Sequence, residues 1–313
     1  MRQSLAQMFH RLYDDRMDVL TDVVASVRTG RPHSARTERS RPFGVRHEAF
    51  GGAGFHVVLQ GSCCVIPPVS GPIVLGVGDV VFLPRGAAHA VADSLATPLS
   101  GTPVALPELQ PSRDEAAPVV LVCGAYLLDR SRPHPLLAQL PDVIHLPARV
   151  GQYPALRATI DLLGAELEQP RPGGDGAATS LLDLLLLYIL RTWFDEQADH
   201  GGAGWAAALR DPAVAAGLHA IHDAPDRQWT VERLGAQGGL SRAAFARRFA
   251  ALVGQPPLTY LAWWRMTVAA RLLRDSDAPL ATIARQVGYG SQYAFAHAFK
   301  REHGLSPGAF RNT

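Results

Sequence analysis

The sequence predicts an α+β protein of several domains, in which a strand-rich N-terminal barrel or sandwich with flanking helices precedes an all-α C-terminal domain. Short apolar runs broken by Gly and Pro fill residues 43–128, a pattern typical of a small barrel or sandwich. Two segments within residues 231–310 share another pattern, a short helix, a turn with glycine and a second helix. The chain of 313 residues is long enough for two domains.

The N-terminal half begins with a predicted helix at residues 12–27 and a polar, Arg-rich loop at 29–42. β-type runs follow, and we expect strands at 55–59, 62–66, 73–75, 80–83 and 119–123. A Pro-containing polar insert at 98–118 is expected to form a mobile loop.

Helical periodicity returns after the strands. The predicted helices span 156–168 and 180–197, with a Pro- and Gly-rich break at 170–176 between them. The second helix is apolar nearly all round, which favours packing under the barrel or a dimer interface. Its apolar run is far shorter than the ~20 residues that span a bilayer, so no membrane association is expected.

The two similar C-terminal segments are centred on Ser241 and Ser291. Each serine precedes a helix and can cap its free N–H groups. Phe245 and Phe249, like the matching phenylalanines of the second copy, stand four residues apart and thus share one helix face. We therefore predict two helix-turn-helix units, at about 231–252 and 280–302, joined by a rigid helix over 258–274.

The charge distribution and the cysteines restrict the class of protein. Residues 211–313 carry 12 Lys or Arg against 7 Asp or Glu, whereas the chain as a whole has a net charge of +2. The positive excess accompanies the paired helices, as a phosphate-binding surface requires. Three cysteines give no disulfide framework, and residues 1–20 lack the apolar core of a signal peptide. We expect a cytoplasmic protein.

The C-terminal segment resembles the DNA-binding domain of the AraC/XylS family of bacterial transcription regulators. The residues that carry the resemblance are Trp229–Glu232, Ser241–Phe249, Gly254–Tyr260, Trp264–Met266, Val287–Tyr289, Phe299–Arg301 and Gly304–Arg311. The resemblance extends from Asp211 to Arg311, about a third of the chain. The resemblance implies a protein that binds double-stranded promoter DNA, works with RNA polymerase and, as most relatives do, activates transcription.

The strand-rich region resembles the cupin-type sensor domains attached to many members of that family. Gly78, Pro84, Gly86 and His89 match every fixed position of the second cupin motif. The resemblance implies that these strands close into a cupin-like β-barrel with flanking helices. We therefore divide the chain into a cupin-like sensor domain (1–169), a linker with an apolar helix suited to homodimerisation (170–210) and the DNA-binding domain (211–313). The effector is unknown, and no obligatory cofactor is expected.

The metal ligands of cupin enzymes are only partly present. His56 and His89 occupy two ligand positions, whereas Val58 replaces a second first-motif histidine and the expected glutamate is missing. Cys63, Cys64 or Cys123 could complete a soft site with the histidines, since zinc accepts mixed nitrogen and sulfur ligands. The alternative is a pocket lined by His56, His89, Cys63 and Cys123 without a metal.

In the first helix-turn-helix unit, at about 231–252, the resemblance places Ala243, Ala246 and Arg247 against DNA bases. Arg247 can donate two hydrogen bonds to guanine; the alternatives are a solvated charge or a phosphate contact. Arg242 and Arg248 are expected to bind phosphates.

In the second helix-turn-helix unit, at about 280–302, the equivalent base-reading residues are Gln292, Tyr293 and His297. Glutamine pairs with adenine, whereas His297 stands where the family often has arginine, which predicts weaker and pH-sensitive reading. Lys300 and Arg301 either contact phosphate or complement the C-terminal dipole of their helix.

The sequence therefore predicts a sequence-specific transcription regulator and not an enzyme. Two other hypotheses stay open. The barrel could be a metal-dependent dioxygenase or isomerase, although the missing ligands disfavour it. A redox switch could act through an exposed cysteine of low pKa, such as Cys123.

Overall fold

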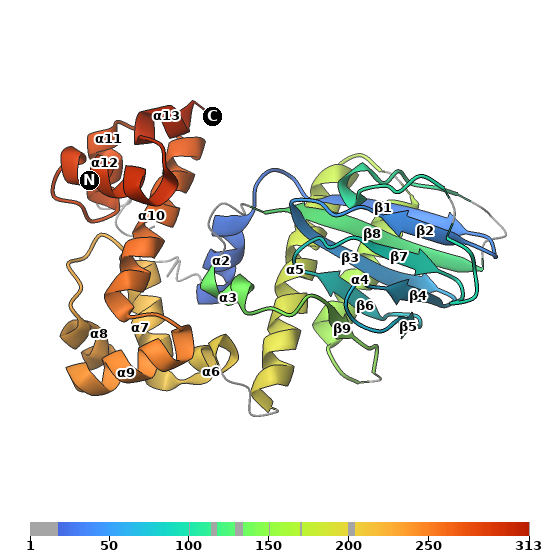
Figure 1. Cartoon of the computed structure of the whole chain (residues 1–313), viewed down its shortest axis with the longest axis horizontal. Coiled ribbons are helices and arrows are strands. Elements are labelled where there is room, and N and C mark those ends of the chain that lie inside the picture. Colours follow the sequence, from blue (N-terminus) through green and yellow to red (C-terminus); the bar gives the residue numbers. More distant parts are fainter. Residues whose placement is uncertain are drawn as a thin grey trace, which may run out of the picture. The chain divides into compact units, whose positions relative to one another are not determined.

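The computed structural model describes residues 18–99, 101–113, 118–128, 134–149, 151–169, 171–199 and 204–312. They form two compact units (Figure 1). The first unit contains residues 27–206, and the second combines residues from 207 onward with the segment that ends at Ser26. Helix α2 (Val19–Val27) comes first in the sequence but belongs, except for its last residue, to the unit of the C-terminal helices. The expected helix at 12–27 is confirmed for these residues, and 12–17 lie outside the described part.

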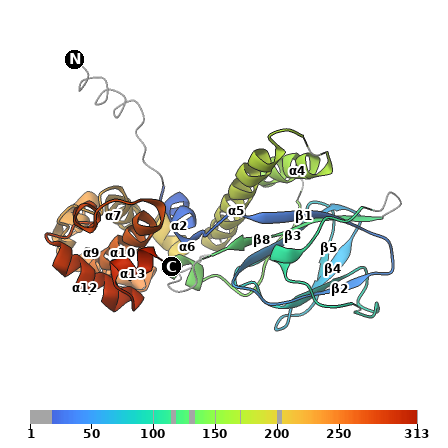
Figure 2. The ribbon, with the colours of Figure 1, turned by 90° about the horizontal axis from the view of Figure 1, so that it is seen from above.

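The strands of the first unit form two antiparallel sheets. They are β1 (His33–Arg39), β2 (Gly44–His47), β3 (Gly52–Gln60), β4 (Cys63–Ile66), β5 (Ile73–Leu75), β6 (Val80–Leu83), β7 (His89–Ala92), β8 (Val119–Leu127) and β9 (Ile144–Leu146). One sheet has the order β1-β8-β3-β6-β9 and the other β2-β7-β4-β5. Figure 2 shows strands of the two sheets as separate layers, with α4 and α5 beyond the larger sheet.

The expectation of a closed barrel is not confirmed. Within the described ranges, no backbone ladder joins an edge strand of one sheet to an edge strand of the other. Closure requires continuous pairing around the whole circumference, and the smaller sheet consists of strands of only three or four residues. The result is a two-layered sandwich.

The apolar runs predict the positions of β3, β4, β5, β6 and β8 correctly. The Arg-rich segment at 29–42, predicted to be a loop, instead contains β1. Only Ala35 and Thr37 are buried in this strand, so its sequence carries almost no apolar signal. Its backbone pairs along its whole length with β8, from His33 opposite Ala125 to Arg39 opposite Val119. The apolar runs do not predict β2, β7 or β9 either, since each of these strands has only three or four residues.

The core of the sandwich consists of side chains from both sheets, including Val58, Leu83, Val91 and Leu121. The segment at 98–118, expected to be a mobile loop, contributes to this core. It contains a short 3₁₀ helix, η1 (Leu106–Glu108), and both Leu106 and Leu109 are buried in the core cluster.

Three helices accompany the sandwich: α3 (Pro135–Ala138), α4 (Pro154–Glu168) and α5 (Gly174–Asp199). The last two confirm the predicted helices, and α5 begins earlier than expected, inside the Gly-rich break. Of the helices in the described part, α5 alone is long and apolar enough to cross a membrane by length and composition. Leu185, Leu186 and Ile189 are buried, however, and α5 packs against α4 and β9, which is the packing of a core helix.

The C-terminal helices are α6 (Trp205–Arg210), α7 (Pro212–Asp223), α8 (Val231–Gln237), α9 (Arg242–Val253), α10 (Pro257–Asp275), α11 (Leu280–Gln286), α12 (Gln292–His303) and α13 (Pro307–Arg311). Helix α10 confirms the connecting helix expected at 258–274. Its N-terminal half buries Tyr260, Leu261 and Trp264, and its C-terminal half packs on Phe295 and Phe299 of α12. Each half of α10 therefore supports one of the two similar helix pairs.

Candidate DNA-binding surface and histidine cluster

The first helix pair consists of α8 and α9. A turn at Gly238–Leu240 separates them, and Gly239 adopts a φ of 69°, a conformation that glycine reaches without steric cost. The Ser241 hydroxyl accepts the Ala244 N–H at 3.4 Å, which confirms the expected N-cap. Phe245 and Phe249 are fully buried. The predicted inner face of α9 thus lies in the core, and its opposite face is available to a ligand.

The second pair, α11 and α12, repeats this construction. Gly288 in the turn has a φ of 78°, and its carbonyl accepts a hydrogen bond from the Gln228 amide at 3.1 Å. The Ser291 hydroxyl caps α12 by accepting the Ala294 N–H at 3.1 Å. Phe295 and Phe299 are fully buried, as expected. The same capping chemistry therefore begins both second helices.

On α9, the structure exposes most of the residues expected to contact DNA. Ala243, Arg247 and Arg242 are exposed, whereas Ala246 is half-buried. Ala243 and Arg247 lie on the side of the helix away from Phe245 and Phe249, and Arg242 is exposed in the first turn. Together the four residues offer two guanidinium and two methyl groups to a DNA groove.

Arg248 differs from the other arginines of α9 because it has a protein partner. Its Nε donates to Oδ2 of Asp211 at 2.5 Å. Asp211 is almost fully buried and also caps α7, where its Oδ1 accepts the N–H groups of Ala213 and Val214. The expected phosphate role of Arg248 therefore competes with a contact that ties α9 to α7.

On α12, Gln292, Tyr293 and His297 are all exposed, and the Tyr293 side chain has 78% of its surface free. The rings of Tyr293 and His297 lie 5.7 Å apart and so share one side of the helix. Lys300 and Arg301, in the last turn, are exposed too, and Arg301 lies 3.5 Å from Glu302. The base-reading candidates of this helix form one polar surface.

Helix α7 contributes a buried histidine, His222, which contacts α2 and α10. Nδ1 of His222 is 3.0 Å from Oδ2 of Asp22 on α2, and its Nε2 is 2.7 Å from the Tyr260 hydroxyl. Its ring stacks on Trp264, with ring centres 3.9 Å apart. Burial lowers the pKa of His222, and the Asp22 carboxylate only partly opposes this shift. The contact joins α2 and α7 to α10.

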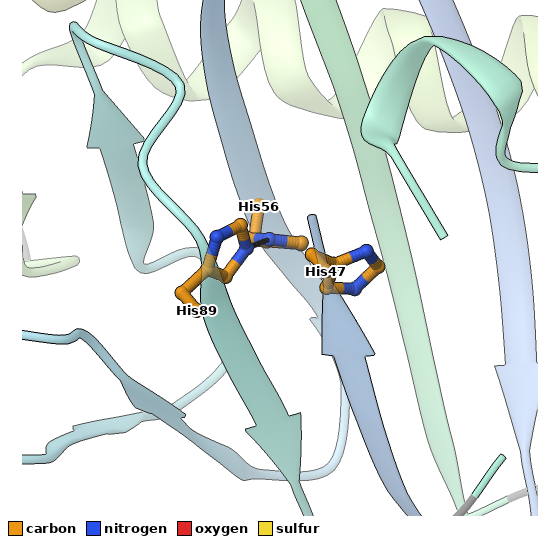
Figure 3. Close-up of side chains that lie close together, drawn as sticks. All are labelled: His47, His56 and His89. Carbon is orange, nitrogen blue, oxygen red and sulfur yellow. Dashed lines mark hydrogen bonds between the residues drawn. The ribbon is translucent and has the colours of Figure 1, made fainter. Parts of the chain in front are cut away.

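A second group of histidines lies inside the sandwich (Figure 3). His47 and His89 are register partners on β2 and β7, so their side chains point to the same face of the smaller sheet. His56 reaches them from β3 of the larger sheet. Ligand nitrogens of the three lie within 4.8 Å of one another, and all three residues are buried. We call His47, His56 and His89 the histidine cluster.

The hydrogen bonds of the cluster are specific. Nδ1 of His47 lies 3.1 Å from the Val104 carbonyl, and Nδ1 of His89 lies 2.8 Å from the Ala87 carbonyl. Nε2 of His56 is 2.7 Å from Nε2 of His89, and its Nδ1 is 2.9 Å from Sγ of Cys123. The structure therefore brings together three of the residues expected in the sensor pocket, His56, His89 and Cys123.

Burial makes the cluster neutral. It lowers the pKa of His47 to about 4, with a further contribution from His89. The pKa of His56 is well below its ordinary value and that of His89 is lowered, in both cases mainly by burial. Uncharged imidazoles are the form that binds metal ions.

The three cysteines do not meet the condition of the redox hypothesis, which requires exposure and a low pKa. Cys63, Cys64 and Cys123 are free and buried. Burial raises the pKa of Cys63 and of Cys123 to about 12 in each case, and it also raises the pKa of Cys64. Thiols of this kind are inert compared with redox-sensing cysteines.

The first unit also has an open cavity of about 680 Å³ next to α4. Its lining includes Leu146, Tyr153, Leu156, Ile160 and Arg157. A cavity of this volume suits a small organic molecule. It combines apolar walls with guanidinium groups.

The sequence patterns do not identify His47 as a site residue. It stands in a short strand, and neither cupin motif includes it. The only signal in the sequence is that a histidine precedes His56 in the same strand-rich region, which is too weak to select it. The pairing of β2 with β7 places it beside His89.

Comparison with known proteins matches two family models, Cupin over residues 18–195 and Helix-turn-helix domain over residues 234–313. A putative AraC-like transcription regulator of Streptomyces lividans is 35% identical over 94% of this chain and 98% of its own length. The RCS-specific activator RclR of Escherichia coli (strain K12) is 28% identical over 82% of this chain and 83% of its own.

Among solved structures, the chain is similar to the DNA-binding domain of AdpA, determined in complex with a target DNA. The identity is 36%, the match covers 33% of this chain and 91% of that one, and the TM-score is 0.31. The family models and the full-length relative establish the identity of the whole chain. It belongs to the AraC family of DNA-binding transcriptional regulators, with a cupin domain ahead of its helix-turn-helix domain.

Proposed function

We propose that the chain is a cytoplasmic transcription activator that reads a two-part promoter site with two helix-turn-helix units, α8–α9 and α11–α12. One observation carries this proposal. The two second helices begin at equivalent serine caps, bury equivalent phenylalanines and expose their remaining polar faces. Two such helices on one connecting helix suit two successive major grooves, about 34 Å apart.

Base reading is assigned to the exposed face of each second helix. On α9, Arg247 donates to a guanine and the methyl groups of Ala243 and Ala246 contact thymine. On α12, Gln292, Tyr293 and His297 form the corresponding surface. Gln292 pairs with adenine, and His297 accepts or donates according to its protonation.

Phosphate contacts are assigned to exposed cations at the ends of the same helices. Arg242 begins α9, and Lys300 and Arg301 lie in the last turn of α12. These contacts hold the helices in register and carry no sequence information. The positive excess of residues 211–313 supports this role.

The sandwich unit is assigned the sensor role, without catalysis. Its cavity beside α4 offers room for a small-molecule effector. Helices α4 and α5 expose Leu162 and Leu184, respectively, which supports a homodimer interface on this helix pair. The Escherichia coli relative RclR is named as a transcriptional activator, which supports the activator role, with RNA polymerase as the partner that an activator recruits.

Footprinting of the full chain on its own upstream DNA tests the proposal. The variants are Arg247→Ala and a control, Arg271→Ala, which removes an exposed arginine of α10 that pairs with Asp275 in its own helix. We expect a footprint over two half-sites. Arg247→Ala should weaken one half-site by about 5- to 150-fold, the equivalent of ~1–3 kcal/mol, and Arg271→Ala should leave both unchanged.

Two results would contradict the assignment. Equal loss from both half-sites in Arg247→Ala would show that this residue contributes to general affinity and not to base reading. A footprint of a single half-site for the wild type would show that only one helix pair reads DNA.

A further inference from the structure

The histidine cluster lies outside the surface proposed to read DNA. Each of its three imidazoles has a specific hydrogen-bond partner. It lies between the two sheets, and three elements supply its members: β2, β7 and β3. We propose that His47, His56 and His89 together bind one divalent transition-metal ion of the zinc type. The proposal deepens the sensor role assigned to the sandwich, but it concerns binding and stands without any effect on DNA.

Two of the imidazoles are already oriented as metal ligands. A histidine that binds a metal through one nitrogen usually donates its other N–H to a carbonyl or carboxylate, which fixes the ring. Nδ1 of His47 and Nδ1 of His89 both have backbone carbonyl partners, at 3.1 and 2.8 Å. With Nδ1 as the donor, each ring keeps the lone pair on Nε2 for an ion.

The third imidazole completes the set from the opposite sheet. Nε2 of His56 lies 2.7 Å from Nε2 of His89, the distance of a hydrogen bond in which one proton stands between the two nitrogens. An ion bound to both nitrogens takes the place of this proton, and the nitrogens then move apart to about 3.3 Å, since each lies ~2.0–2.1 Å from a tetrahedral zinc-type ion. His56 binds such an ion as the neutral tautomer whose single proton is on Nδ1. The Cys123 sulfur, 2.9 Å from Nδ1, is placed to accept it. Cys123 thus positions His56 and is not itself assigned as a ligand.

The chemistry of the donors selects the class of metal. In the part of the chain that the structure describes, the cluster contains three imidazoles and no carboxylate. Magnesium and calcium require oxygen ligands, whereas imidazole suits zinc and its transition-metal neighbours. Three protein ligands also leave the fourth position of a tetrahedral ion open.

The surroundings limit what can occupy that fourth position. A small cavity of about 10 Å³ lies beside His47 and Cys123, with Thr37 and Arg39 in its wall. This is about the space of one water molecule. Of the three ligands, His47 lines this cavity, which has room beside the cluster for a water molecule as a fourth ligand and none for an organic effector.

The site differs from the ligand set that the two cupin motifs would give. His56 and His89 belong to the motif positions, but the third ligand, His47, comes from a strand ahead of both. It compensates for Val58, which replaces a motif histidine. The neighbouring Cys63 and Cys64 are not members of the cluster.

The test is metal titration of the untagged full chain after chelation and dialysis, first with Co²⁺ and then with Zn²⁺. We expect about one ion per chain, the visible d–d bands of tetrahedral Co²⁺, and loss of these bands when Zn²⁺ displaces it. His47→Gln and His89→Gln should each weaken binding by at least about 100-fold, because changes to the outer partners of ligands already cost 10- to 100-fold. The control His145→Gln, a half-buried histidine of β9, should bind like the wild type. Cys123→Ser changes the partner of His56, so it should weaken binding but keep the d–d bands of the bound Co²⁺.

Three results would overturn the proposal: wild-type protein that takes up no Co²⁺, a folded His47→Gln variant that binds like the wild type, or a thiolate-to-cobalt charge-transfer band that disappears in Cys123→Ser. Circular dichroism shows whether each variant folds, and the wild-type titration decides the question even where a variant does not. A footprint with metal-free wild type separates this proposal from DNA binding, since either can fail while the other holds.

Discussion

Asp211 caps α7 and holds Arg248 of α9, and its replacement by alanine gives a quantitative prediction. The carboxylate accepts the N–H groups of Ala213 and Val214 at 3.1 and 3.0 Å, and its second oxygen binds Arg248. Loss of an N-cap costs about 1 kcal/mol. The Arg248 side chain is 57% exposed, so the ion pair contributes only about 0.5–1 kcal/mol.

Asp211→Ala should therefore lower the free energy of unfolding by about 2 kcal/mol. Asp211→Asn keeps a good capping side chain and should lose only the ion-pair part, as Arg248→Ala should. Urea unfolding of the full chain, followed by far-UV circular dichroism, measures these differences. In a double-mutant cycle, Arg248→Ala should have no further effect once Asp211 is alanine.

The same variants decide what Arg248 does on DNA. If Asp211 holds the guanidinium, Arg248→Ala leaves the salt dependence of DNA affinity nearly unchanged, whereas Arg242→Ala lowers the slope of log K against log salt by about 1. Affinity titrations at several salt concentrations measure the slope. A slope reduced by about 1 in Arg248→Ala, with unchanged stability, would refute the structural role and restore the phosphate contact.

Three further predictions concern the interior of each unit. A Cβ on Gly238 would lie 2.3 Å from Cα of Ala213. Gly238→Ala should therefore destabilise the second unit by about 1–3 kcal/mol in thermal or urea unfolding. Gly239→Asn, at an exposed αL position, should lower the free energy of unfolding much less. Burial lowers the pKa of His222 from its ordinary 6.5, so the unfolded chain binds the proton more tightly. The contribution of this residue to stability is complete above pH 6.5 and is lost as pH falls below it, and a His222→Gln variant should show a flatter pH dependence of unfolding below pH 6.5. Cys123, buried and with its pKa raised to about 12, should react with a maleimide only after unfolding; rapid labelling of the native protein would revive the redox hypothesis.

Local signals in the sequence predict the helices of the second unit well. Serine caps, glycine turns and phenylalanines four residues apart are interactions within one helix or between consecutive helices. The strands of the first unit are predicted where they are apolar. Strand β1 escapes prediction because its stability comes from pairing with β8, a partner far along the chain.

The candidate sites divide in the same way. Exposure of Arg247, Gln292 and Tyr293 follows from helix periodicity, so the surface proposed to face DNA could be predicted in outline. The partner of Arg248 could not, since Asp211 reaches α9 only when α7 packs against it. Nor does composition reveal that the cysteines are buried.

The sequence by itself determines the family, the two kinds of domain and the exposed faces of α9 and α12, because these depend on spacings of a few residues. Only the tertiary structure decides that the strands form an open sandwich, that Arg248 has a buried partner and that His47 joins His56 and His89. These depend on strand register and on packing between distant segments. A register shift of one residue would turn His47 to the other face of its sheet, and no local pattern in the sequence records which register forms.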